Sequence, residues 1–380
     1  ILITLVPNTS PHYPTWKLAV PSAAGGNFTL IGSLTQITND SNGTGGEMAV
    51  TYLSSRRFVY VYTRADNNES RIQIGTVSGS GNSRTISWSG AQVLDGSSTG
   101  GRYSSFQIQK IGTNRVAVFG TARNSSSRWS DDKPGVMILD ISGSTSTYRS
   151  SAQLSTDNSA SNWWRSSLAY NSTDDLCLAT WWRSSSILNQ RAFKVDSGTS
   201  ATITLGSEAG VSITNDRQTL VWHPTQNKFL LAFNQGSASS IKTVIYTVNS
   251  STLAITGTSP ATVSSSAGKS NEGIFLVVSA QNTIHLKTID NSRQSYTYVD
   301  NSFDGSTFNI DVEGNTSTTY NGYLDGQVRS ISVSGSATED IISVYGTTSA
   351  VMDRKPVGIV NKIVSTTSNL VNMNHVVGFA

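Results

Sequence analysis

The stretch EMAVTYLSSRRFVYVYTRADNNESRIQIGTVSG, residues 47–79, contains three short runs that are rich in Val, Ile, Tyr and Phe. A tight polar turn, SSRR, separates the first two runs, and a longer polar loop, TRADNNES, precedes the third. Short runs of β-branched and aromatic residues bounded by polar turns are typical of antiparallel strands. The stretch therefore predicts three consecutive strands of one small sheet.

The same order of runs recurs along the 380-residue chain. Further copies lie at 103–143, 165–198, 217–250, 272–302 and 326–364. One more short run, such as TISWSGAQVL or LAITGTSPATV, lies between successive copies. A four-stranded antiparallel unit repeated about every 50–60 residues is typical of a β-propeller blade. We therefore predict an all-β propeller of about six four-stranded blades, with seven blades as the alternative.

The two ends of the chain predict how the ring closes. Residues 15–37 resemble the last two strands of a blade, whereas the copy at 326–364 lacks a clear fourth strand. Joining the N- and C-terminal strands in one blade removes two exposed sheet edges. We therefore expect an N-terminal arm at 1–14, a propeller at 15–364, and a C-terminal extension at 365–380 that leads to or packs beside another segment.

Composition limits the classes of partner. Only 13% of the residues are charged, the net charge is +3, and the basic residues are scattered along the chain. Binding to nucleic acid needs a clustered cationic face, so no nucleic-acid partner is expected. No apolar run approaches the roughly 20 residues of a membrane helix, so no membrane insertion is expected. The single cysteine, Cys177, excludes an internal disulfide and is predicted to be a small buried side chain.

The pentapeptide WWRSS occurs twice, at 163–167 and 181–185. These copies flank the first hairpin of the third blade, so both should lie at the same end of that blade. Two interpretations stay open. At least one Trp of each pair packs in the core, because alternate side chains of a strand point to opposite faces. Alternatively, the rings form an exposed platform for a glycan or a protein.

The second blade has aromatic residues and arginines at the corresponding end, before its first strand and after its second. The predicted ligand-binding residues are therefore Arg102, Tyr103, Arg128, Trp129, Trp163, Trp164, Arg165, Trp181, Trp182 and Arg183.

Catalytic residues are not evident in the sequence. Glycoside hydrolysis needs two carboxyl groups about 5–9.5 Å apart, and the acids of this chain are few and lie mostly in turns. The segment SFDGSTF, residues 302–308, resembles the Asp-box turn of sialidases, but glycine directly follows Asp304 and the last position is Phe308. We predict no catalytic residue, with a sialidase-like or glycosidase-like enzyme as an alternative.

No cofactor is predicted, and metal binding has one candidate. The four histidines are far apart and lack metal-ligand spacing. In NDSNGTGGE, residues 39–47, the oxygen-bearing side chains of Asp40, Asn42, Thr44 and Glu47 have a spacing similar to that of a calcium loop. The loop is short and lacks a second pair of acids, so a Gly-rich connector is the other interpretation.

The units AVTYLSSRRFVYVYTRADNNESRIQIGTVSG and LVWHPTQNKFLLAFNQGSASSIKTVIYTV, together with the tail TSNLVNMNHVVGFA, resemble propeller-bearing virion proteins of tailed, mainly marine, bacteriophages. This resemblance implies a non-enzymatic tail or fibre-type structural protein, located on the virion or outside the cell. Its partners would be other virion proteins, further copies of itself, or a glycan on the host surface. The resemblance transfers no catalytic residue, and the WWRSS loops depart from it. A secreted bacterial lectin-like propeller is the alternative.

Overall fold

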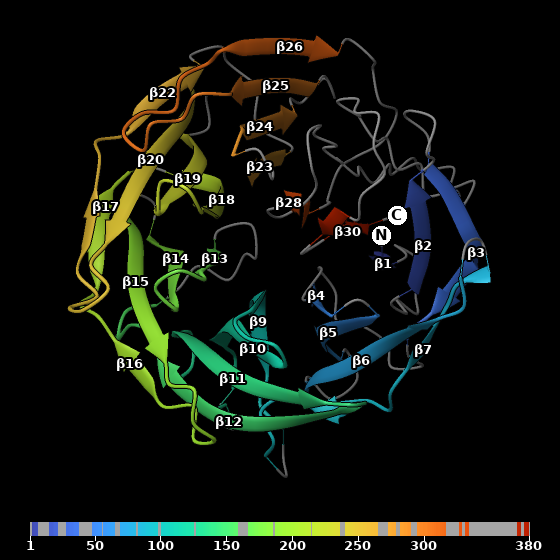
Figure 1. Cartoon of the computed structure of the whole chain (residues 1–380). Coiled ribbons are helices and arrows are strands. Elements are labelled where there is room, and N and C mark those ends of the chain that lie inside the picture. Colours follow the sequence, from blue (N-terminus) through green and yellow to red (C-terminus); the bar gives the residue numbers. More distant parts are fainter. Residues whose placement is uncertain are drawn as a thin grey trace.

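The residues that the computed structural model describes contain no α-helix, and their strands form six sheets. The sheets follow one another around a ring (Figure 1). No described segment forms a helix that could span a membrane. The described residues are 2–6, 15–21, 28–37, 48–54, 56–64, 69–80, 83–97, 100–124, 127–158, 166–184, 187–213, 215–235, 240–264, 273–278, 282–289, 295–316, 327–328, 331–333, 371–373 and 376–379.

Four of the predicted repeats form four consecutive blades, each an antiparallel sheet in which the strands follow the order of the chain. The first blade contains β4 (Met48–Ser54), β5 (Arg57–Thr63), β6 (Ser70–Ser78), β7 (Thr85–Trp88) and β8 (Gln92–Val93). The second contains β9 (Tyr103–Lys110), β10 (Arg115–Ala122), β11 (Pro134–Ser142) and β12 (Thr145–Gln153). The third contains β13 (Ser166–Asn171), β14 (Leu176–Ser184), β15 (Ile187–Val195), β16 (Ile203–Leu205) and β17 (Ala209–Ser212). The fourth contains β18 (Asn215–His223), β19 (Lys228–Gln235), β20 (Ser240–Val248), β21 (Ile255–Gly257) and β22 (Ala261–Ser264).

The first, third and fourth blades contain five strands each, one more than predicted, and the additional strand lies at the outer edge of the blade. In the first, third and fourth blades the outermost strand is split into two short segments that pair with the same third strand, and in the second blade it is continuous. The four-stranded unit predicted from the sequence is thereby confirmed in these four blades.

The remaining two sheets contain both ends of the chain. The fifth blade contains β23 (Gly273–Val278), β24 (Ile284–Ile289), β25 (Ser295–Asp300) and β26 (Val312–Thr316), extended by β28 (Ile331–Val333) and β29 (Val371–Met373). The closing sheet contains β1 (Leu2–Val6), β2 (Thr15–Pro21), β3 (Phe28–Gln36), β27 (Gln327–Val328) and β30 (Val376–Phe379).

The closing sheet joins N- and C-terminal strands, as the sequence predicts, because β1 pairs with β2 on one side and with β30 on the other. The predicted N-terminal arm, 1–14, thus contributes β1, and the predicted C-terminal extension, 365–380, contributes β30. Most of the sixth predicted repeat, 326–364, lies outside the described residues. The domain boundaries and the number of blades therefore stay predictions.

The core lies between blades. Every residue of β10 except its first is buried, whereas no residue of β12 is fully buried. An inner strand has a neighbouring blade on each of its faces, so both sets of alternating side chains leave water. One apolar cluster joins Phe119 of the second blade to Phe193 and Cys177 of the third. Burial raises the pKa of the Cys177 thiol, so this side chain has the small-hydrophobe role expected from the sequence.

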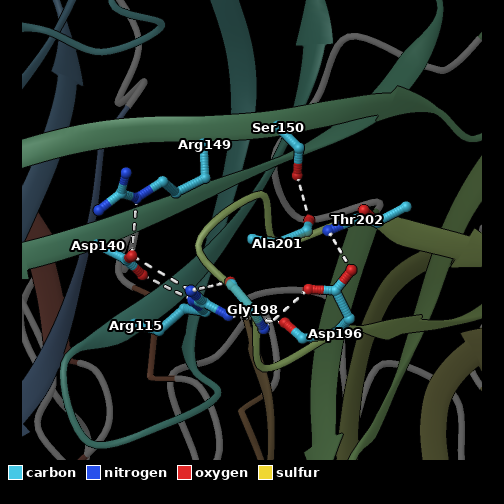
Figure 2. Close-up of polar contacts among 8 residues, drawn as sticks. All are labelled: Arg115, Asp140, Arg149, Ser150, Asp196, Gly198, Ala201 and Thr202. Atoms are coloured by element: carbon cyan, nitrogen blue, oxygen red, sulfur yellow. Dashed lines mark hydrogen bonds and ion pairs between the residues drawn. The ribbon is translucent and has the colours of Figure 1, made fainter.

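A network of polar contacts ties the second blade to the third (Figure 2). Arg115 of β10 donates from Nε to Asp140 Oδ1 at 2.6 Å and from Nη2 to Asp140 Oδ2 at 3.2 Å. The same guanidinium reaches the turn after β15, where it donates to the carbonyls of Asp196 at 2.7 Å and Gly198 at 3.0 Å. Arg149 of β12 donates to Asp140 Oδ2 at 2.8 Å. Arg115 therefore donates hydrogen bonds to acceptors in both blades, a carboxylate in the second and two carbonyls in the third.

A buried histidine ties the fourth blade to the fifth. His223 Nδ1 accepts from the N–H of Gln226 at 3.2 Å, which assigns the ring proton to Nε2, the atom that lies 2.9 Å from the carbonyl of Asn282. The ring also packs against Phe303, with 5.0 Å between centroids. Burial lowers the pKa of His223, while the contact with Asn282 and the charge of Asp300 oppose this shift. Both nitrogens of the neutral His223 ring therefore have hydrogen-bond partners at this junction.

We expect the free energy of unfolding to fall between pH 7.5 and pH 5, with His223 contributing to the loss. Because the pKa of His223 is lower in the folded than in the unfolded chain, the unfolded chain binds the proton first as the pH falls. The stability from the neutral ring is complete above the unfolded pKa, about 6.5, and is lost as the pH falls toward the folded pKa. Urea unfolding of the wild type and His223→Gln at both pH values measures this. An equal pH dependence in the two proteins would contradict it.

Candidate functional site

One end of the ring gathers the starts of the first strands and the ends of the second strands; we call this end the loop face. Strand register places Tyr103 opposite Ala122 in the second blade and Ser166 opposite Trp181 in the third. The latter pair belongs to the two WWRSS copies. The prediction that both copies lie at the same end of one blade is thereby confirmed.

Hydrogen bonds connect the first and second strands of neighbouring blades around the ring. Thr63 Oγ1 donates to the carbonyl of Tyr103 at 2.7 Å, which links the first blade to the second. Gln107 Nε2 donates to Ser166 Oγ at 3.0 Å, which links the second to the third. Thr180 Oγ1 donates to Gln218 Oε1 at 3.4 Å, which links the third to the fourth. The loop faces of four consecutive blades therefore form one continuous end of the molecule.

The predicted aromatic platform is wrong for the four described aromatic residues that it included. Trp181 is 0% exposed and stacks on Phe119 of the second blade, with ring centroids 6.4 Å apart. Trp182 is 9% and Trp129 7% exposed, and Tyr103 is fully buried. The other interpretation, in which at least one Trp of a pair packs in the core, is confirmed for the second WWRSS copy. Both faces of β14 are covered, so neighbouring Trp side chains that point in opposite directions are both buried.

Three predicted site residues cannot be placed. Trp163, Trp164 and Arg165 lie outside the described residues, and so do the calcium candidates, which are Asp40, Asn42, Thr44 and Glu47. Within the described part of the chain, no group of three or more His, Cys, Asp or Glu could hold a metal ion.

The loop before β9 is built around a buried carboxylate. Asp95 Oδ2 accepts from Tyr103 Oη and from the Gly101 N–H, each at 3.0 Å, and Asp95 Oδ1 accepts from Ser97 Oγ at 2.7 Å. Burial raises the pKa of the Tyr103 phenol. A side chain at position 101 would collide with the Asp95 carboxylate. A Cβ atom added to Gly101 would lie 2.6 Å from Asp95 Oδ2. Tyr103 and Asp95 therefore fix the loop and present no group to a ligand.

Two predicted arginines are exposed, and each has partners. Arg128 donates from Nε and Nη2 to the carbonyl of Asp95 at 3.1 and 2.7 Å, and its guanidinium lies 4.5 Å from the centroid of the Tyr148 ring. Arg183 forms an ion pair with Asp157 at 3.0 Å, and 41% of its side chain is exposed. Arg128 therefore holds the loop, whereas Arg183 stands at the surface with its counter-ion.

The remaining predicted arginine, Arg102, lies beside an arginine that the sequence analysis missed. The N–H of Arg123 donates to the carbonyl of Arg102 at 2.9 Å, so the residues before β9 and after β10 are neighbours. Arg123 donates from Nε to Ser104 Oγ at 2.7 Å and forms an ion pair with Asp132 through Nη1. Among the described residues, the buried atoms Arg102 Nε and Arg123 Nη2 have no hydrogen-bond acceptor.

A positional signal in the sequence could have identified Arg123. An arginine lies at the end of the second strand of three successive blades: Arg64 and Arg123 directly follow β5 and β10, and Arg183 is the last residue but one of β14. The loop face thus carries arginines at corresponding positions of adjacent blades. This arrangement can donate several hydrogen bonds and can attract negative charge.

The Asp-box-like turn has a structural role. Asp304 Oδ1 accepts from the N–H of Ser306 at 2.8 Å and from its hydroxyl at 2.7 Å, and Gly305 takes a φ of +87°. Phe303 and Phe308, on either side, are buried in the cluster between the fourth and fifth blades. The segment therefore fixes a turn and anchors it in the core.

Comparisons with known proteins agree at the level of the fold. No protein-family model matches the sequence, and no curated protein sequence matches it significantly. A variant of AofleA from Arthrobotrys oligospora superposes with a TM-score of 0.51 at 8% identity, over 83% of this chain and 86% of that chain. A lectin from Aleuria aurantia in complex with Fucα1-6GlcNAc gives a TM-score of 0.46 at 10% identity, over 83% and 96% of the two chains. The chain is therefore an all-β propeller that is similar to AofleA in its fold alone.

Proposed function

We propose that this chain is a lectin-like protein that binds a saccharide at its loop face. One observation carries the proposal: arginines occupy corresponding strand ends of adjacent blades, and Arg102 and Arg123 have buried N–H groups without an acceptor among the described residues. A saccharide offers many hydroxyl oxygens within a small volume, and a guanidinium offers five N–H donors in a fixed plane.

A carbohydrate-active enzyme is the competing function, and three described carboxylates of the loop face favour binding over hydrolysis. Asp95 is buried in its own loop, while Asp132 and Asp157 form ion pairs with Arg123 and Arg183. A hydrolase needs one carboxyl group that holds a proton and a second one placed across the scissile bond. Asp132 and Asp157 each hold an arginine instead.

The virion location implied by the resemblance to phage propellers stays a prediction, and so do its virion partners. Saccharide binding does not depend on it, because a phage adhesion protein and a secreted lectin would use the loop face alike.

We expect labelled protein to bind a subset of saccharides on a glycan array. Arg102→Gln should weaken that binding at least tenfold, because it removes a planar donor from the loop face. Arg84→Gln is the matched control. Arg84 is exposed and directly precedes β7, which begins at the opposite end of the first blade. A protein that binds no saccharide, or that releases sugar from the array, would contradict the proposal.

A further inference from the structure

Arg102 is held in place through its main chain. Its N–H donates to Asn124 Oδ1 at 3.1 Å, and its carbonyl accepts from the N–H of Arg123 and from Ser127 Oγ, each at 2.9 Å. Ser127 Oγ also lies 2.9 Å from Asn124 Oδ1. The start of the Arg102 side chain is therefore fixed by the loop after β10, although its guanidinium takes no part in these bonds.

Only one of the two arginines has a counter-ion among the described residues. Asp132 is the counter-ion of Arg123, and the Asp95 carboxylate binds Tyr103, Gly101 and Ser97 instead. The Arg102 guanidinium has no ion pair and no hydrogen bond within the part of the chain that the structure describes. The two arginines and Asp132 together therefore carry one net positive charge.

This positive charge is partly withdrawn from water. Arg102 is half-buried, and its Nε is fully buried without an acceptor in the described structure. A buried donor without an acceptor costs about 1–3 kcal/mol, and more when the group is charged. A sugar hydroxyl can accept from the guanidinium of Arg102 but cannot balance its charge, whereas a carboxylate does both and matches the guanidinium as a two-bond acceptor.

From this arrangement we infer that the saccharide bound at the loop face is acidic, with a sugar carboxylate that pairs with the guanidinium of Arg102. This inference rests on the proposed saccharide binding and narrows it to one chemical class. The ion pair between Arg123 and Asp132 orients the Arg123 guanidinium, so that Asp132 acts as a positioning residue.

The test is a glycan array printed with matched pairs. Each uronate or sialoside oligosaccharide stands beside its carboxyl-reduced counterpart, which is neutral but has the same linkages. We expect at least one acidic member to bind tenfold or more tightly than its reduced partner. In Arg102→Gln this preference for the acidic member should disappear. Arg102→Lys should show part of the preference, because lysine supplies the charge but lacks the planar donors of arginine. The control Arg84→Gln should keep the full preference. An unchanged thermal unfolding midpoint in each variant shows that folding is intact.

The other outcomes separate the two claims. Equal binding of acidic and reduced members overturns the inference and leaves saccharide binding standing. No binding to any saccharide overturns both. Competition by inorganic phosphate at the concentration at which the acidic saccharide competes would show a simple anion site, and it would also overturn the inference.

Discussion

Replacing Trp181 by alanine is expected to lower the free energy of unfolding by about 3–5 kcal/mol, the range measured for truncation of large buried aromatic side chains. The Trp181 side chain is 0% exposed and lies between the second and third blades, where it stacks on Phe119. Its removal leaves a cavity that rigid neighbouring sheets cannot readily fill. Equilibrium unfolding in urea, followed by far-UV circular dichroism, measures the change.

The control for Trp181 stands on the same strand. Arg183→Gln removes a side chain that is 41% exposed and forms a surface ion pair with Asp157, so it should cost less than about 1 kcal/mol. This comparison also decides between the two interpretations of the WWRSS copy. A Trp181→Ala protein with wild-type stability and weakened saccharide binding would show that this ring faces a ligand after all.

Arg115→Met is expected to lower the free energy of unfolding by about 2–3 kcal/mol, the upper range for hydrogen bonds that involve charged groups. The substitution removes two bonds to Asp140 and leaves the carbonyls of Asp196 and Gly198 without this donor, while the methionine keeps most of the apolar stem. Because Arg115 reaches into the third blade, the loss should loosen a junction between blades (Figure 2).

Arg149→Met is the matched control for Arg115. Arg149 binds the same carboxylate through one bond, with 31% of its side chain exposed, so its loss should cost about 1 kcal/mol or less. The hydrogen bond from Arg115 is the main reason that the pKa of Asp140 lies below its ordinary range. The stability from this carboxylate is therefore present above the unfolded pKa and is lost as the pH falls through the folded pKa. The difference between the wild type and Arg115→Met should shrink accordingly, and a constant difference down to pH 2 would contradict this role.

The fold could be predicted from the sequence because its signals are local. Alternating apolar runs and polar turns define each strand, and their repetition defines the blade. Hairpin geometry also placed the WWRSS copies together, as the pairing of Ser166 with Trp181 confirms. The contribution of Leu2–Val6 to the closing sheet was missed, since a short apolar run at a chain end does not reveal its pairing partner.

The candidate site was harder to predict, because burial and charge pairing depend on contacts between distant segments. Whether Trp181 is exposed depends on the neighbouring blade, which no local pattern describes. Likewise, Arg123 has Asp132 as its counter-ion only because the loop after β10 folds back, and Arg102 lacks one among the described residues. Sequence reasoning therefore placed these residues together at one end of the propeller, but it assigned recognition to rings that pack in the core.

The crystal structure of the protein with an array-selected oligosaccharide bound tests the central claim most directly. The account predicts that electron density for the sugar lies on the loop face, with an acidic group within hydrogen-bonding distance of the Arg102 guanidinium. Density on the opposite end of the ring, beside Arg84 or Arg115, would contradict it.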